Sequence, residues 1–282
     1  MGVSKDCIDD YLCAETGLPV TLCNCPGHTT HTGLLAELNN RDPRLLQTVC
    51  SPEAGEHTYY LKGHPANIAN IVNTGAGGSS STGYSIAKFY NAAEHLAAHH
   101  QGTLDAPVFR FGEILLIRAE AAAELGTISQ TDLDATVNKL RERVGFNHKL
   151  TMSPAVDPKL EAEYPNVSAN NATLIREIRR ERRVELFGEG YRFDDLRRWA
   201  CGKRLDASVA PRMGMIPDAK LYSPENITAM QNVLGTNSKG ELDIYSKRVD
   251  TQARFEDPKN YLFAIPTNEI SINPNLTQNT GW

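Results

Sequence analysis

The segment from Asn171 to Gly202, NATLIREIRRERRVELFGEGYRFDDLRRWACG, constrains the fold more than any other part of the chain. Its apolar periodicity of 3.6 residues runs from Ile175 and Ile178 to Arg182 and then Leu186, so the face that should be buried contains an arginine. A buried guanidinium needs a carboxylate partner, because an unpaired buried charge costs several kcal/mol. We therefore predict a helix that is buried only because ion pairs compensate its charges.

Carboxylates that could pair with this arginine lie on the same helix and just after it, at Glu177, Glu181, Glu185, Asp194 and Asp195. Gly188 and Gly190 can end the first helix with a left-handed residue. A second helix is expected from Asp194 to Trp199, with acids first and arginines last, as the helix dipole favours. We predict a helical hairpin over residues 171–202, with a structural network that includes Arg182, Glu185, Asp194 and Trp199.

An arginine-rich helix can also bind nucleic acid, which requires net positive charge along one face. Here glutamates are interleaved with the five arginines between Arg176 and Arg183, and the whole chain carries a net charge of −5. We expect no nucleic-acid partner.

Earlier in the chain, another helix is predicted from Phe109 to Leu125. Its expected apolar face, wide enough to be buried on more than one side, consists of Phe111, Ile114, Leu115, Ile117, Ala119, Ala122 and Leu125. Gly126 ends it, and Thr131 and Asp132 open a partner helix whose apolar positions are Leu133, Val137, Leu140 and Val144. The short loop predicts an antiparallel hairpin over residues 109–145, the unit of tetratricopeptide-like repeats.

The predicted fold is therefore mainly α, with stacked tetratricopeptide-like hairpins. Residues 1–38 are expected to be loop-rich, residues 46–89 to form an irregular layer of loops and short strands, and residues 261–282 to form a non-repetitive closing segment packed against the helices. No apolar run approaches the ~20 residues of a membrane span.

Three segments resemble the SusD/RagB family of nutrient-binding outer-membrane lipoproteins of Bacteroidetes. REIRRERRVELFGEGYRFDDLRRW resembles the family's signature helix pair, FRFGEILLIRAEAAAELG its preceding repeat helix, and YLFAIPTNEISINPNLTQNTGW its closing segment. With the NRDPRL element near Asn40, the resemblance spans residues 39–282 and corresponds to the C-terminal half of longer members. Residues 1–38 are then expected to be the loop-rich N-terminal segment of a truncated chain.

The resemblance implies non-catalytic glycan binding at the cell surface and delivery of the ligand to a SusC-like TonB-dependent transporter. It also implies an outer-membrane location through a lipid anchor, although neither a secretory signal nor a lipidated cysteine is recognisable in this chain. Because sugars stack on aromatic rings, we expect ligand contacts from Tyr59, Tyr60 and Tyr84. A peptide nutrient, or a helical-repeat scaffold that binds a protein partner, remains an alternative.

Two further classes of function find little support in the sequence. We find no catalytic motif, so we predict that the protein is not an enzyme and needs no cofactor. Five of the six cysteines lie within the first fifty residues, and His28 and His31 follow Cys23 and Cys25. Because their spacing matches no standard zinc pattern, we predict unpaired or variably paired thiols and no metal site.

Overall fold

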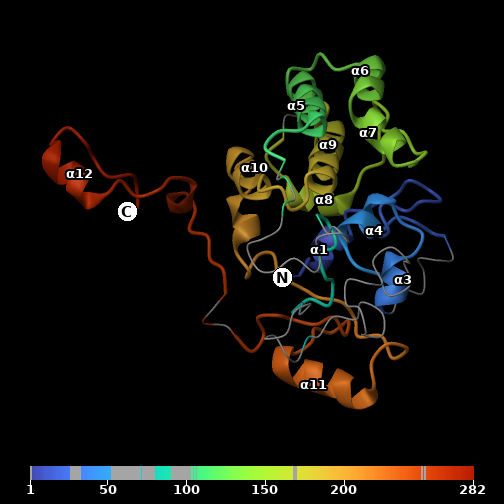
Figure 1. Cartoon of the computed structure of the whole chain (residues 1–282). Helices are drawn as coiled ribbons and strands as arrows, with labels where there is room; N and C mark the ends of the chain where they lie inside the picture. The colour runs from blue at the N-terminus through green and yellow to red at the C-terminus, as the bar shows by residue number, and fades with distance from the viewer. Residues whose placement is uncertain are drawn as a thin grey trace.

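The computed structural model describes residues 2–25, 33–51, 71, 80–89, 103, 105, 107–167, 170–248, 250 and 252–282. The helices are α1 (Lys5–Ile8), α3 (Leu34–Leu38), α4 (Arg44–Thr48), α5 (Phe111–Glu124), α6 (Gln130–Ala135), α7 (Val137–Arg143), α8 (Pro158–Glu163), α9 (Ala172–Glu185), α10 (Arg192–Arg198), α11 (Pro224–Leu234) and α12 (Thr267–Ile272). Two 3-10 turns, η2 (Gly202–Leu205) and η4 (Lys259–Tyr261), follow α10 and precede α12. The prediction of a mainly helical protein is confirmed (Figure 1).

The loop layer contains no named strand among the described residues. Its pairing there is limited to isolated bridges, such as those between Val49 and Ile86 and between Gly2 and Ser85. None of the described helices is both long enough and apolar enough to cross a membrane.

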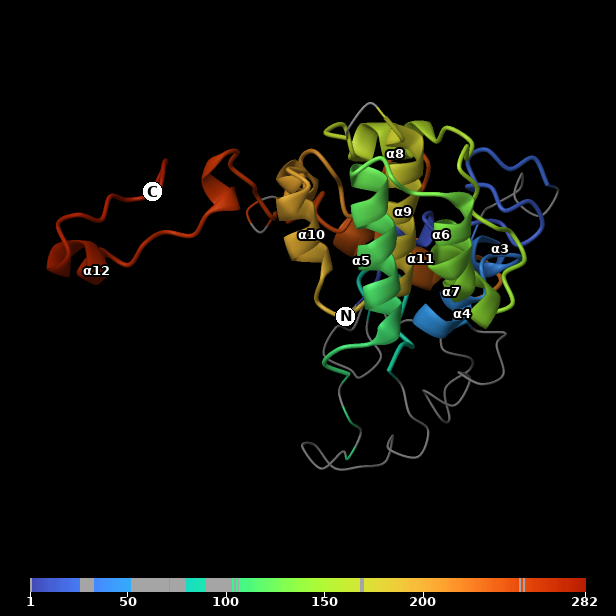
Figure 2. The ribbon, with the colours of Figure 1, turned by 90° about the horizontal axis from the view of Figure 1, so that it is seen from above.

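Helix α9 lies at the centre of the helical body (Figures 1 and 2), where α5, α7 and α8 all contact it. One side of α9 places Leu174, Ile175 and Ile178 in an apolar core shared with α5, α6 and α7. The rest of its buried surface is charged, since Glu177, Arg179, Arg180, Glu181, Arg182 and Glu185 are all buried. The fold therefore places ionic groups, not only apolar ones, in its interior.

The arginine in the predicted apolar face is paired across the hairpin. Arg182 Nε donates to both carboxylate oxygens of Asp195, at 2.9 and 2.8 Å, and both side chains are buried. Asp194, which the predicted network included, is instead 77% exposed and lies 3.8 Å from Arg197. This corrects the prediction. In α10 the side chain of Asp195 points back toward α9, whereas that of Asp194 points to solvent.

The same C-terminal part of α9 is also tied to α4, to α7 and to the residue that precedes α5. Arg44 of α4 lies 2.5 Å from Glu181 and 3.1 Å from Glu185, and Arg141 of α7 lies 2.9 Å from Glu181. Glu185 also pairs with Arg110, which precedes α5, at 2.6 Å. Burial by itself would raise the pKa of Glu181, but the charges of Arg141 and Arg44 outweigh it and lower that pKa to about 2.

Residues before α3 belong to the body and are not a detached segment. Although α1 has only four residues, Ile8 and Tyr11 are fully buried. Arg183 of α9 pairs with Asp6 at 2.7 Å and with Asp10 at 2.5 Å. Ion pairs thus join the N-terminal residues to α9.

Helix α10 is linked to α5 through Glu120, which the sequence pattern did not indicate as a partner. Trp199 Nε1 donates to Glu120 Oε1 at 2.6 Å, and Arg198 donates to both oxygens of Glu120 at 2.6 and 2.7 Å. Of the four residues predicted for the network, Arg182, Glu185 and Trp199 are buried and make such contacts, whereas Asp194 is not.

The buried face of α5 differs from the predicted one. Leu115 and Ala119 are buried as expected, but Phe111, Ile114, Ile117 and Leu125 are exposed, and Leu116 and Ala123 are buried instead. The physical reason is hydrogen bonding. In this orientation Glu120 accepts a hydrogen bond from Trp199, and Glu113 accepts one from the hydroxyl of Tyr191.

The closing segment does not pack against the helices as predicted. It extends away from the body (Figures 1 and 2), and Phe263 and Ile272 are 70% and 77% exposed. Its hydrogen bonds are largely internal, as between Gln278 and both backbone groups of Ile265, each at 2.8 Å. It joins the body at its start, where the Tyr261 hydroxyl accepts from the Gly202 amide at 2.9 Å.

The two adjacent aspartates of α10 provide a matched test of the buried network. Asp195→Ala leaves the Arg182 guanidinium buried without its partner, so the free energy of unfolding should fall by about 3 kcal/mol or more. Asp194→Ala removes an exposed carboxylate and should change it by less than about 0.5 kcal/mol. Urea unfolding followed by circular dichroism measures both, and equal effects would contradict the assignment.

The pKa of Glu181 predicts an acid dependence of stability. Because its folded-state pKa is depressed to about 2 from an ordinary 4.5, its stabilisation is complete above about pH 4.5 and disappears as the pH falls toward 2. This contribution is roughly 3 kcal/mol. In unfolding titrations across that window, Glu181→Gln should show a flatter pH dependence than the native chain, whereas the exposed control Glu142→Gln should keep the native slope.

Candidate ligand-binding pocket

Of the three tyrosines predicted to contact a ligand, only one is described. Tyr59 and Tyr60 lie outside the described residues, and their role stays a prediction. Tyr84 is fully buried, and its hydroxyl donates to Glu37 Oε2. It therefore has no ring face open to a sugar, which corrects the expectation for this residue. The reason is that Glu37, buried in α3, needs a hydrogen-bond donor.

The Glu37 carboxyl is perturbed by its surroundings. Burial raises its pKa to about 7, although the nearby Lys5 ammonium and the hydrogen bond from Tyr84 both act to lower it. Tyr84 thus stabilises a buried acid in the core.

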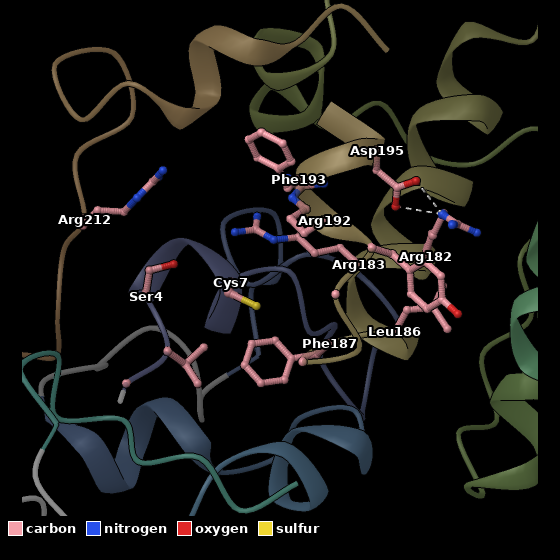
Figure 3. A pocket seen from close by; sticks show the side chains of 15 residues that line it. Ser4, Cys7, Arg182, Arg183, Leu186, Phe187, Arg192, Phe193, Asp195 and Arg212 are labelled. Atoms are coloured by element: carbon pink, nitrogen blue, oxygen red, sulfur yellow. Dashed lines mark hydrogen bonds and ion pairs between the residues drawn. The ribbon is translucent and has the colours of Figure 1, made fainter. Parts of the chain in front are cut away.

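A cavity of about 450 Å³ opens between the start of the chain and the turn that joins α9 to α10. We call it the aromatic pocket. Its lining includes the first residues of the chain together with Arg183, Phe187, Tyr191, Arg192, Phe193 and Arg212. In Figure 3, Phe193 is seen above and Phe187 below the level of Ser4 and Cys7, and Arg212 lies on a separate segment at the left. Parts of the chain far apart in sequence thus meet at one cavity.

The turn between α9 and α10 sets the spacing of the aromatic side chains. Gly188 and Gly190 both have positive φ, +75° and +92°, which allows the chain to reverse within a few residues of Glu185. Tyr191 is fixed by its hydroxyl, which donates to Glu113 at 2.6 Å. Phe193 is 44% exposed, so part of its ring remains accessible.

The cations around the pocket differ in how they are compensated. Arg183 is neutralised by Asp6 and Asp10. Arg212 donates to the backbone carbonyls of Ala210 and Arg204, at 3.1 and 3.0 Å, and Arg192 donates to the Tyr164 hydroxyl at 2.9 Å. Within the described ranges, neither Arg192 nor Arg212 forms an ion pair with a carboxylate.

Aromatic surface and guanidinium donors of this kind suit a polyhydroxylated ligand. Ring faces pack against the C–H groups of a sugar, while guanidinium N–H groups donate to its hydroxyl oxygens. The pocket brings both to one concave surface.

A smaller cavity of about 220 Å³ touches residues 46–89, the predicted loop layer that contains the three tyrosines expected to contact a ligand. Lys88 and Phe89 line it, together with Arg110. Its charges are already paired, since Lys88 and Arg110 both contact Glu189, at 2.7 and 2.5 Å. It therefore offers a ligand fewer free donors than the aromatic pocket does.

The sequence places Phe187, Tyr191 and Phe193 within the predicted hairpin over residues 171–202, and we did not predict a binding role for them. The available signal was their position on both sides of a Gly-Glu-Gly turn, since aromatic residues on a tight turn seldom all reach the core. What the sequence could not show is that the first residues of the chain complete the cavity.

Tyr84→Phe should act on stability and not on ligand binding. Loss of a hydrogen bond to a charged group should lower the free energy of unfolding by about 1.5–3 kcal/mol. The pKa of Glu37, already raised, should rise further, so stability should continue to fall with pH above 7. Unfolding measured on both sides of pH 7 tests this against Tyr245→Phe, whose hydroxyl makes no hydrogen bond to the described residues. Weaker glycan retention by Tyr84→Phe at unchanged stability would return this residue to the binding site.

The sequence and the fold were compared with those of known proteins. The model of the SusD family matches residues 1–282, so the similarity extends further toward the N-terminus than the three sequence motifs indicate. The fold is similar to that of a SusD-like carbohydrate-binding protein from Bacteroides fragilis, with a TM-score of 0.64 and 22% identity over 97% of this chain and 48% of that one. It is also similar to another SusD-like protein from Bacteroides fragilis, with a TM-score of 0.58 and 23% identity over 100% of this chain and 47% of that one.

At these identities the likeness to solved structures shows the fold alone, and the chain spans about half the length of those proteins. A search of curated proteins found no match. The family model, in contrast, covers the chain from end to end, and we conclude that this protein belongs to the SusD family.

Proposed function

We propose that this protein binds a glycan without transforming it, and that the aromatic pocket is its binding site. Family membership supports a binding protein rather than an enzyme. A structural neighbour is described as a carbohydrate-binding protein. The observation that carries the choice of site is the coincidence of a partly exposed Phe193 with Arg192 and Arg212, which lack carboxylate partners among the described residues, around one cavity.

We further propose that binding takes place at the outer surface of the outer membrane and that the ligand passes to a SusC-like TonB-dependent transporter. A binding protein that hands its cargo to a transporter needs only moderate affinity, because a very slow release rate would limit uptake. We expect a dissociation constant between micromolar and millimolar, or roughly −4 to −8 kcal/mol.

The test uses native gels cast with soluble starch, arabinoxylan, pectin or mucin, in which a bound protein migrates more slowly. We expect at least one polysaccharide to retard the native chain. Phe193→Ala should weaken that retardation by roughly threefold to tenfold, because one aromatic contact contributes about 0.5–1.5 kcal/mol. Arg212→Ala should also weaken it by removing a hydroxyl donor.

The matched control is Phe109→Ala, because Phe109 is 80% exposed but lies outside the pocket. Equal losses for Phe109→Ala and Phe193→Ala would show that the retardation is nonspecific. If Phe193→Ala and Arg212→Ala both leave the retardation unchanged, the aromatic pocket is not the binding site. Binding of a peptide digest, with no polysaccharide retained, would replace a glycan by a peptide as the nutrient.

A further inference from the structure

Three of the six cysteines converge on one buried point. The sulfur atoms of Cys13, Cys23 and Cys25 all lie within 4.8 Å of one another, and the three residues are buried. The Cys25 sulfur lies 3.5 Å from that of Cys13 and 2.9 Å from that of Cys23. Leu18 packs against the group.

Two backbone turns build this convergence. The Cys13 amide donates to the Leu18 carbonyl at 2.9 Å, and the Cys23 amide donates to the Pro19 carbonyl at 3.0 Å. Gly17, with φ +69°, allows the first reversal. The spacing along the chain, nine residues and then one, hides a cluster that exists only after the chain has folded back.

The sulfur atoms also receive backbone donors. The amides of Glu15 and Thr16 donate to Cys13 Sγ at 3.3 and 3.4 Å, and the Cys25 amide donates to Cys23 Sγ at 3.3 Å. Hydrogen bonds from N–H groups favour an ionised acceptor over a neutral one. Such donors around ligand atoms are also the usual outer layer of a metal site.

We propose that Cys13, Cys23 and Cys25 form a three-thiolate site for a thiophilic metal ion of the zinc class. Zn²⁺ bound to thiolates at about 2.3 Å holds them about 3.8 Å apart in a tetrahedron, so the Cys13–Cys25 separation already fits, and Cys23 must move away from Cys25 by roughly 1 Å. The three cysteines supply three of the four positions of such a tetrahedral site. Binding releases one proton from each thiol that ionises, and the ion with three thiolates carries a net charge of −1.

A disulfide explains the arrangement less well, because it uses two sulfur atoms and leaves the third without a role. Cys23 and Cys25, with one residue between them, are also poorly placed to bridge each other. A metal ion uses all three. The site would lock residues 13–25 against the loop that follows α7, where the ring nitrogen Nε2 of His148 lies 3.0 Å from the Ala14 carbonyl oxygen.

The test uses the whole chain, reduced and kept free of oxygen, with Co²⁺ as a spectroscopic probe. We expect thiolate-to-cobalt charge-transfer absorption that saturates at one ion per chain and disappears when Zn²⁺ displaces the cobalt. Cys13→Ser and Cys23→Ser should each weaken binding by about tenfold or more. Cys50→Ser, in which a buried cysteine elsewhere in the fold is changed, should bind as the native chain does.

A second readout does not depend on the variants. Zn²⁺ should protect Cys13, Cys23 and Cys25 from alkylation in the native chain, as located by peptide mass spectrometry, while the other three cysteines react alike with and without the metal. The proposal is overturned if the reduced chain shows no charge-transfer absorption, or if Zn²⁺ protects none of the three. It is also overturned if protein refolded with Zn²⁺ carries a Cys13–Cys25 disulfide. None of these outcomes bears on glycan binding.

Discussion

The burial of guanidinium and carboxylate groups together on α9 is the interaction on which the rest of the fold depends. Removing either partner alone would leave a charge in a low-dielectric interior, at a cost of several kcal/mol. Each arginine of α9 that turns inward therefore requires an acid from another element, and each acid requires an arginine. Through these pairs α1, α4, α7 and α10 all contact one helix.

This network also determines where the candidate binding surface lies. The pair between Arg182 and Asp195 sets how α10 returns against α9, and the glycine turn between the two helices carries the aromatic residues. Arg183 holds the N-terminal residues, some of which line the pocket, through Asp6 and Asp10. The same ionic contacts that stabilise the body thus shape the aromatic pocket.

The local sequence pattern was sufficient to predict some features of the fold and insufficient to predict others. The 3.6-residue period identified α9 and marked Arg182 as buried, because that information lies within one helix. It could not choose between Asp194 and Asp195, since adjacent residues differ only in the direction imposed by tertiary packing. The face of α5 was misassigned because Glu120 is drawn inward by Trp199 and Arg198, which are about 80 residues away in sequence.

The candidate site was less predictable than the fold for the same reason. Tyr84 looked available because it lies in a loop region, yet a buried Glu37 from another segment captures its hydroxyl. Cys13 and Cys25 matched no ligand spacing, because the two turns between them bring their sulfur atoms together only in three dimensions. Contacts between distant segments are not encoded in periodicity or spacing.

The central claim, that paired burial of charge holds α9 and α10 together, is tested most directly by a double-mutant cycle on Arg182 and Asp195. The unfolding free energies of Arg182→Met, Asp195→Leu and the double variant are compared with that of the native chain. We predict a coupling energy of about 2 kcal/mol or more, with the double variant more stable than either single variant, because replacing both partners leaves no charge buried alone. Additive losses, with a coupling energy near zero, would contradict the account.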